Sequence, residues 1–206
     1  MAIAQGTQSG SGPAEKPTTG TLVVVRHGAT EWSESGRHTS RTDLPLVPAG
    51  RRRAQGLARV LDRKDFARVL CSPLRRALET CELAGFGGEG VEIYEDLREW
   101  DYGDYEGLTT PEIWREWPGW LLWRDGCPGG ESPAQVAARA DRVIGLLDER
   151  DTIAFAHGHL LRVLAARWIG LGPEGGGRLA LSPARLSKLG YERAQRVIEH
   201  WNVDSL

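Results

Sequence analysis

The chain has 206 residues, 26% of them charged, and a formal net charge of −2. This length suits a single α/β domain. This charge balance excludes attraction of nucleic acid by overall charge, so any anion site needs a local cluster of cationic groups. The cysteines, Cys71, Cys81 and Cys127, are odd in number and lack metal-type spacing. They favour a reducing compartment over a disulfide framework.

Residues 1–20 are rich in Gly, Ser, Thr and Pro and contain neither a hydrophobic signal region nor a basic amphipathic pattern. We therefore expect a disordered tail and not a targeting signal. No later stretch approaches the roughly 18 uncharged apolar residues that a membrane helix needs. The expected location is the cytoplasm, with no membrane partner.

The first half of the remaining chain alternates short apolar runs with helical patterns. Residues 22–26, a β-branched run, predict a strand buried on both faces. Ala54, Leu57, Ala58 and Leu61 recur at helical spacing within an arginine-rich segment. The elements predicted here are a strand at 22–26, a polar loop, a helix at about 49–63, a strand at 67–72, a helix at 73–85 capped by Ser72, and a weak strand at 91–94.

The second half begins with an aromatic- and glycine-rich segment at about 97–130, which predicts a lid or rim with short helical pieces at best. Ser132 is a good cap for a long helix over 133–150. An apolar run ending in histidine follows, as at the start of the chain. The remaining predicted elements are a strand within 151–159 with His157 at its tip, a helix at 160–172 stopped by Gly170 or Gly172, and strands near 186–191 and 196–201.

This order predicts a three-layer α/β/α sandwich with a mostly parallel central sheet. Sheets of that kind bind ligands at the carboxyl ends of their strands. His27 and His157 each directly follow an apolar strand, so both are expected at that edge.

Several cationic and imidazole groups should converge at these strand ends. Arg26 and His27 follow the first strand, Arg75 and Arg76 open the helix after the second, and His157 follows the later one. Guanidinium groups bind phosphate oxygens in pairs and keep their charge at any working pH. The cluster therefore predicts a phosphate site.

A neutral imidazole is a nucleophile, so a phosphoryl group can pass from a monoester to His27 and then to water. The leaving alkoxide needs a proton, and Glu99 is followed closely by Trp100 and Tyr102, which can desolvate its carboxyl group. The competing carboxylates in the same stretch are Asp101, Asp104 and Glu106.

Four ordered motifs, "RHGATEWSESGRHTSRTDLPL", "CSPLRRALET", "DLREWDYGDYEG" and "FAHGHLLR", resemble the histidine phosphatase superfamily, with its phosphoglycerate mutase-like fold. The resemblance covers about residues 22–200 and assigns no cofactor. It implies that His27 is the phosphorylated nucleophile and Glu99 the proton donor. Arg26, Arg76 and His157 would form the phosphate pocket, which leaves Arg75 at the surface.

Within this superfamily the motifs are most similar to sugar-phosphate phosphatases, including sedoheptulose-1,7-bisphosphatase, and to small acid phosphatases. That branch implies that His38, Thr39, Tyr102 and Arg162 border the substrate, with Arg162 a candidate for a second phosphate. Ser33 stands where many members carry a phosphate-binding asparagine. A serine hydroxyl can donate the same hydrogen bond with shorter reach.

Other interpretations stay open. A phosphoglycerate mutase shares every catalytic residue, and a non-catalytic phosphate-binding module would share the pocket. The His157-x-His159 spacing can ligate zinc, but no carboxylate or cysteine accompanies it at a familiar spacing, so we expect no metal. The expected partner is a small phosphorylated substrate, without nucleic acid, and a homodimer stays open. Two features are expected to serve packing or flexibility, the spaced tryptophans Trp114, Trp117, Trp120 and Trp123 and the glycine turn 175–177.

Overall fold

The computed structural model describes residues 20–206. The rest of the predicted tail, residues 1–19, lies outside the described residues. Gly20 is buried, and its backbone N–H donates to the Asp148 carbonyl at 2.6 Å.

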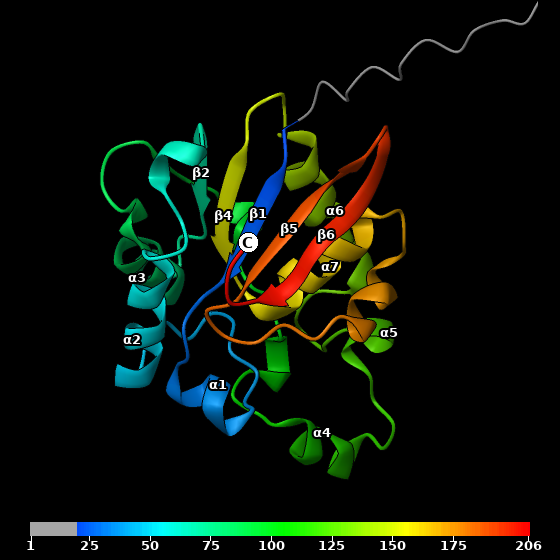
Figure 1. Cartoon of the computed structure of the whole chain (residues 1–206). Coiled ribbons are helices and arrows are strands. Elements are labelled where there is room, and N and C mark those ends of the chain that lie inside the picture. The colour runs from blue at the N-terminus through cyan, green and yellow to red at the C-terminus, as the bar shows by residue number, and fades with distance from the viewer. Residues whose placement is uncertain (1–19) are drawn as a thin grey trace, which may run out of the picture.

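A six-stranded sheet in the order β3-β2-β4-β1-β5-β6 forms the centre of the fold (Figure 1). β3, β2, β4 and β1 pair in parallel, whereas β5 runs antiparallel to β1 and forms a hairpin with β6. The sheet is therefore mostly parallel, as predicted. The strands are β1 (Leu22–Arg26), β2 (Arg68–Cys71), β3 (Val91–Ile93), β4 (Thr152–Ala156), β5 (Leu186–Glu192) and β6 (Gln195–Val203).

Helices cover both faces of this sheet, and several short ones gather beyond one end of it (Figure 1). The helices are α1 (Glu31–Ser35), α2 (Pro48–Leu57), α3 (Arg75–Cys81), α4 (Thr110–Glu116), α5 (Leu122–Asp125), α6 (Pro133–Gly145) and α7 (Gly158–Trp168). A π-helical turn, Glu82–Phe86, extends α3 to Gly85, whose φ of 86° ends the helix where the sequence predicts.

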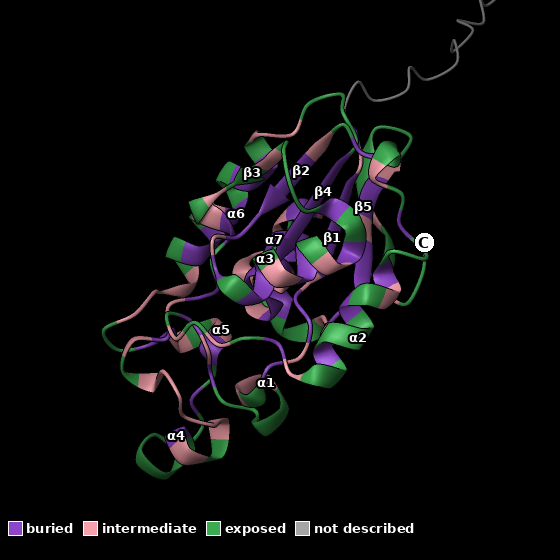
Figure 2. Cartoon of the chain, turned by 90° about the vertical axis from the view of Figure 1, so that its left-hand side faces the viewer, coloured by how far each residue is buried: buried purple, intermediate pink, exposed green. Residues whose placement is uncertain are grey.

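Alternate side chains of the strands divide the core into two layers. Leu22 and Val24 of β1 pack in one cluster with apolar residues of α6 and α7, and Val23 and Val25 pack in the other with residues of α2 and α3. Because successive side chains of a strand point to opposite faces, residues 22–25 are buried on both sides of the sheet. Figure 2 shows the buried strands between helices whose outer faces are exposed. The predicted three-layer sandwich is confirmed.

Helix lengths differ from the prediction. α2 ends at Leu57 and not near residue 63, and α6 ends at Gly145 and not near residue 150. Gly56 and Gly145 lie at these ends, and glycine is a weak helix former. The unpredicted α1 begins with a capping box between Thr30 and Ser33, inside what was expected to be loop.

Ser72 is not the N-cap of α3, so that prediction is wrong. The helix begins at Arg75 with Leu74 at its N-cap. The Ser72 hydroxyl accepts from the Leu74 N–H at 3.3 Å and pairs with Nε2 of His157 at 2.7 Å. The serine therefore links the start of this helix segment to the end of β4.

The central pair of parallel strands brings the two motif histidines together. β1 and β4 pair in the register Arg26 to Ala156, and the His27 N–H continues the ladder to the Ala156 carbonyl at 2.9 Å. His27 and His157 consequently leave the sheet side by side. In the described part of the chain, no helix combines the length and apolarity required to cross a bilayer.

Candidate active site

A cavity of about 250 Å³ opens beyond the carboxyl ends of β1 and β4. Its lining joins residues that the sequence places far apart, and most of the predicted site is among them. The lining residues are Arg26, His27, Ser33, Gly36, Arg37, His38, Thr39, Glu99, Tyr102, Thr110, Gly158, His159 and Arg162. Arg76 and His157 are fully buried beside this cavity.

His27 is oriented by the backbone that follows it. Its Nδ1 lies 2.7 Å from the Gly28 carbonyl oxygen. A carbonyl only accepts, so Nδ1 carries the proton and Nε2 of the neutral ring keeps a free lone pair. Burial, followed by the positive charges of Arg76 and Arg26, holds the pKa of His27 well below its usual value. The imidazole is therefore neutral and nucleophilic at neutral pH.

The Arg76 guanidinium is fixed by the loop that follows α1. Nη1 donates to the Thr42 carbonyl at 3.2 Å, and Nη2 donates to the carbonyls of Thr39 and Ser40 at 3.1 and 3.2 Å. Glu106 in turn accepts from the N–H groups of Ser40 and Thr42. Glu106, a competing carboxylate in the sequence, thus holds the loop that holds Arg76.

Arg26 occupies the last position of β1, and its Nη1 contacts the Leu181 carbonyl. A Cβ on Gly158 would lie 3.2 Å from both Cζ and Nε of this guanidinium. Glycine at the start of α7 therefore lets the cation lie directly against the helix.

Three buried nitrogens around His27 have no hydrogen-bond partner among residues 20–206: Nε of Arg26, Nε of Arg76 and Nδ1 of His157. The His157 ring lies 5.1 Å from the His27 ring between centroids. Leaving a buried polar group unpaired costs about 1–3 kcal/mol. A tetrahedral oxyanion bound here would supply the missing acceptors.

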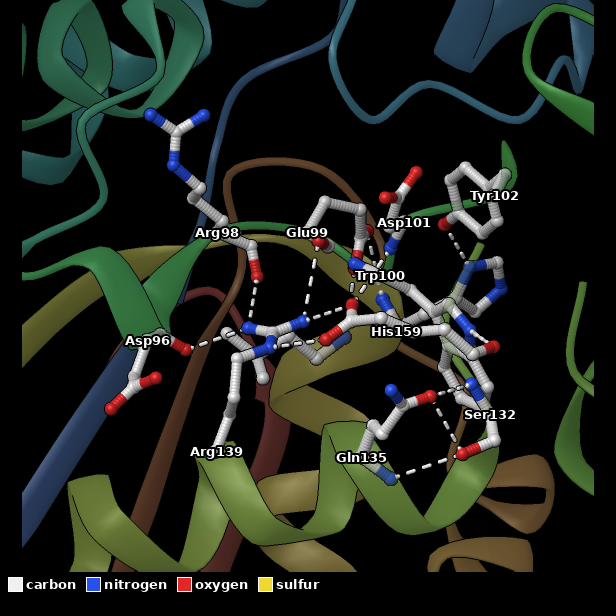
Figure 3. Close-up of polar contacts among 12 residues, drawn as sticks. Asp96, Arg98, Glu99, Trp100, Asp101, Tyr102, Ser132, Gln135, Arg139 and His159 are labelled. Carbon is white, nitrogen blue, oxygen red and sulfur yellow. Dashed lines mark hydrogen bonds and ion pairs between the residues drawn. The ribbon is translucent and has the colours of Figure 1, made fainter. Parts of the chain in front are cut away.

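Glu99 projects from the start of the 97–130 segment toward the N-terminus of α7 (Figure 3). Its carboxylate accepts from the N–H groups of His159 at 3.0 Å and Leu160 at 2.9 Å, and from its own neighbour Trp100 at 2.9 Å. Trp100 and Tyr102 are buried beside it, as expected. Three backbone N–H donors therefore fix the Glu99 carboxyl group, in addition to the two aromatic side chains that shield it from solvent.

The residues of the loop 33–39 form one wall of the cavity. The Ser33 hydroxyl is engaged in the capping box of α1, accepting from the Thr30 N–H at 2.8 Å and donating to the Thr30 carbonyl at 2.9 Å. The Ser33 hydroxyl proton is thus already donated to the Thr30 carbonyl. His38 is buried and donates from Nδ1 to the Leu108 carbonyl at 2.8 Å, and Thr39 donates to the Arg37 carbonyl at 3.1 Å.

The opposite wall carries an aromatic pair. The Tyr102 hydroxyl lies 2.5 Å from Nδ1 of His159. Burial raises the pKa of Tyr102 well above its usual value and lowers the pKa of His159 well below its own, so both groups are neutral. His159 lines the cavity, although in the sequence only its His-x-His spacing draws attention to it.

Arg162 reaches the cavity from α7 and is anchored by the glycine turn 175–177, which the sequence predicts to be only a flexible turn. Nε donates to the Gly176 carbonyl at 2.9 Å, and the guanidinium carbon lies 4.3 Å above the Trp123 ring. A Cβ on Gly176 would come within 2.8 Å of Trp123. This glycine is therefore required for close packing around Arg162.

Some lining residues are absent from the predicted site. Arg37 and Thr110 belong to no catalytic pattern, although Arg37 directly precedes the predicted His38. Arg75 is exposed, as expected, with only its N–H bound to Asp43. Within residues 20–206, no group of three or more His, Cys, Asp or Glu side chains is arranged to hold a metal ion.

The strand-end histidines, buried cations and carboxyl group define a phosphate-ester enzyme of the mutase-like α/β fold. The family model of the histidine phosphatase superfamily (branch 1) matches residues 22–204, and the chain belongs to this superfamily. It is a phosphoric monoester hydrolase.

Individual relatives agree with this assignment. An acid phosphatase of Mycobacterium tuberculosis is 42% identical over 181 residues, covering 85% of this chain and 88% of the relative. The sedoheptulose 1,7-bisphosphatase of Saccharomyces cerevisiae is 38% identical over 186 residues, covering 74% and 68%. A solved structure of a Mycobacterium tuberculosis open-reading-frame product superposes with a TM-score of 0.84 at 39% identity, covering 89% and 97%.

Proposed function

We propose that this protein is a metal-independent phosphomonoesterase that forms a phosphohistidine on Nε2 of His27. The main support for this proposal is the set of three buried, unpaired nitrogens of Arg26, Arg76 and His157 around that imidazole. They match the oxygens of a transferring phosphoryl group, and the free lone pair of His27 supplies the nucleophile.

The reaction has two balanced steps. Nε2 of His27 bonds to phosphorus, the ester P–O bond breaks, and the leaving oxygen takes its electron pair and a proton from Glu99. Water then attacks the phosphohistidine and gives a proton to the Glu99 carboxylate. The P–N bond breaks, inorganic phosphate leaves, and His27 regains its lone pair.

The proposed substrates are small phosphorylated metabolites, namely sugar phosphates or bisphosphates. The cavity size and its polar outer wall, with His38, Thr39, Tyr102 and Arg162, support a hydroxyl-rich ligand. Arg162 lies on α7 beyond the phosphate pocket, where it can bind a second phosphate. The sugar bisphosphatase and acid phosphatase relatives support the same class.

A phosphoglycerate mutase is the second candidate function, because it would use the same His27, Glu99 and His157. It differs in keeping water from the phosphohistidine until the phosphoryl group returns to bound product. Release of inorganic phosphate from 3-phosphoglycerate supports the phosphatase, whereas isomerisation without release supports the mutase. A non-catalytic module would bind phosphate esters without forming phosphohistidine.

The direct test is to capture the intermediate. Wild-type protein is mixed with a phosphate ester, quenched in alkali, and digested, and the phosphopeptide containing His27 is sought by mass spectrometry. His27→Ala is the matched variant and should show neither phosphopeptide nor turnover. Turnover by this variant at the wild-type rate, or loss of wild-type turnover in EDTA, contradicts the proposal.

The proposed setting is the reducing cytoplasm. Cys71, Cys81 and Cys127 are free and buried, which supports a reducing compartment. The homodimer stays a prediction.

A further inference from the structure

The backbone of the turn that carries Glu99 is held by Arg139 (Figure 3). Arg139 of α6 donates from Nη1 to the carbonyls of Asp96 and Arg98 at 2.8 and 2.9 Å. Its Nη2 donates to the carbonyl of Glu99 itself at 3.4 Å. The backbone on both sides of the Glu99 side chain is therefore fixed to α6.

Glu131 completes the arrangement. Its two carboxylate oxygens accept from Nε and Nη2 of Arg139, each at 2.7 Å. One of them also accepts from the Asp101 N–H at 2.9 Å. A guanidinium has five N–H donors in a planar fork, and Arg139 uses its fork on three carbonyls and one carboxylate.

Arg139 has no contact that would make it a substrate ligand. It does not line the cavity, and its side chain is only 12% exposed. What it contacts is the segment 96–99, whose side chain at position 99 reaches the N–H groups of His159 and Leu160. Thus α7 holds the Glu99 carboxyl group, and α6 holds the Glu99 backbone.

We propose that Arg139, paired with Glu131, is a positioning residue that sets the place of the Glu99 carboxyl group for proton transfer. The inference rests on the proposed function, in which Glu99 protonates the leaving oxygen. Because proton transfer requires hydrogen-bond contact, a displacement near 1 Å can cost about 100-fold in rate.

Arg139→Lys tests the geometry while keeping the charge. Lysine retains the positive charge but lacks the fork that reaches three carbonyls and the Glu131 carboxylate. Arg142→Lys is the matched control. Arg142 lies on the same helix and binds the same turn, but it pairs only with the Asp96 carboxylate.

The readout is the dependence on leaving group. A sugar phosphate needs a proton on its alkoxide, whereas 2,4-dinitrophenyl phosphate releases a stable phenolate without one. Arg139→Lys should lower kcat/KM for the sugar phosphate about 100-fold and change kcat/KM for the aryl ester less than about 3-fold, because kcat/KM reports the steps up to phosphoryl transfer to His27 and not the later hydrolysis, in which Glu99 accepts a proton for both esters. Arg142→Lys should leave both within about 2-fold. Equal losses on both esters in Arg139→Lys overturn the proposal.

A double variant separates positioning from general damage. In a Glu99→Gln background the acid is already absent, so adding Arg139→Lys should change kcat/KM for the sugar phosphate less than about 2-fold. A further loss as large as in the wild-type background overturns the proposal. If Arg139→Lys does not fold, Glu131→Gln serves in its place, with a smaller loss in the same direction expected.

Amide hydrogen exchange gives a readout without turnover. Displacement of Glu99 should speed exchange of the Leu160 and His159 N–H groups in Arg139→Lys and not in Arg142→Lys. Unchanged exchange at both N–H groups overturns the proposal. If the wild-type protein hydrolyses neither ester, the proposed function fails, while faster exchange would still support the clamp on Glu99.

Discussion

The imidazole rings of His27 and His157 lie 5.1 Å apart between centroids and are tilted by 56° to one another. Burial lowers the pKa of both rings well below the usual value, and the Arg76 cation is the next largest cause in each case. Burial, reinforced by one shared guanidinium, therefore keeps His27 and His157 neutral together.

The pH dependence of turnover follows from this relationship. A cation beside an imidazole disfavours imidazolium, so the acid limb of kcat/KM in the wild-type protein should fall well below pH 6.5. Arg76→Gln removes the cation and should move this limb upward, toward pH 6.5, besides lowering activity. Measured pH profiles of both proteins decide this, and an unmoved limb would contradict the assigned cause.

Stability should also fall on acidification. Four histidines, His27, His38, His157 and His159, have lowered pKa values in the folded state, chiefly because of burial. Below pH 6.5 the unfolded chain binds protons that the folded chain does not. Each of these histidines therefore adds up to about 1.4 kcal/mol per pH unit to the slope of the free energy of unfolding against pH.

Urea unfolding at a series of pH values between 7.5 and 5 measures this slope. His159→Gln should reduce the slope by about one histidine's share. His200 is exposed on β6, and His200→Gln serves as the matched control for the substitution itself. Stability that stays constant from pH 7.5 to 5 would be inconsistent with four imidazoles whose pKa values are lowered by folding.

Two adjacent arginines should respond differently to the same substitution. Arg76 is fully buried with its fork on three carbonyls, so Arg76→Lys should lower kcat/KM about 100-fold or more, because an ammonium cannot replace a fixed planar fork. Arg75 is exposed, and Arg75→Lys should change kcat/KM less than about 2-fold. Comparable losses in both variants would contradict the assigned phosphate pocket.

The glycine turn beside Arg162 gives a test of the outer wall. Gly176→Ala places a Cβ 2.8 Å from Trp123 and 3.0 Å from the Arg162 backbone, so it should displace the guanidinium. We expect KM for a sugar bisphosphate to rise about tenfold, the loss of one charged hydrogen bond, with KM for an aryl monophosphate little changed. Gly145→Ala, which meets nothing within 4 Å, should leave both KM values unchanged.

The sequence alone predicts the sheet and the core of the site because both depend on local patterns. Apolar runs mark strands, and residues directly after parallel strands must meet at one edge of the sheet, which is why His27 and His157 could be placed together. Helix ends were less predictable. Apolar spacing continues to Leu61, past the Gly56 turn where α2 stops.

The contacts that orient the site cannot be predicted from the sequence because they join distant segments of the chain. The Ser72 hydroxyl meets His157 across 85 positions, and Glu99 meets the N–H of Leu160 across 61. A local rule assigned Ser72 to a helix cap, where a tertiary contact uses the same hydroxyl. No spacing pattern links Arg139 to the turn at 96–99, since that pairing depends on how α6 packs.

The two ends of the aromatic-rich segment at 97–130, which the sequence predicts to be a lid or rim, are joined to each other. The Glu131 N–H donates to the Asp101 carbonyl, and the Asp101 N–H donates to the Glu131 carboxylate, both at 2.9 Å. Between these residues the chain makes an excursion that begins and ends at one point, and buried Ile113, Trp120 and Leu122 pack it into the core. Its exposed tip, residues 115–119, can change length while Glu99 and the strand-end histidines stay in register. Exchange of the whole excursion would also remove Glu106 and so release the loop that holds Arg76.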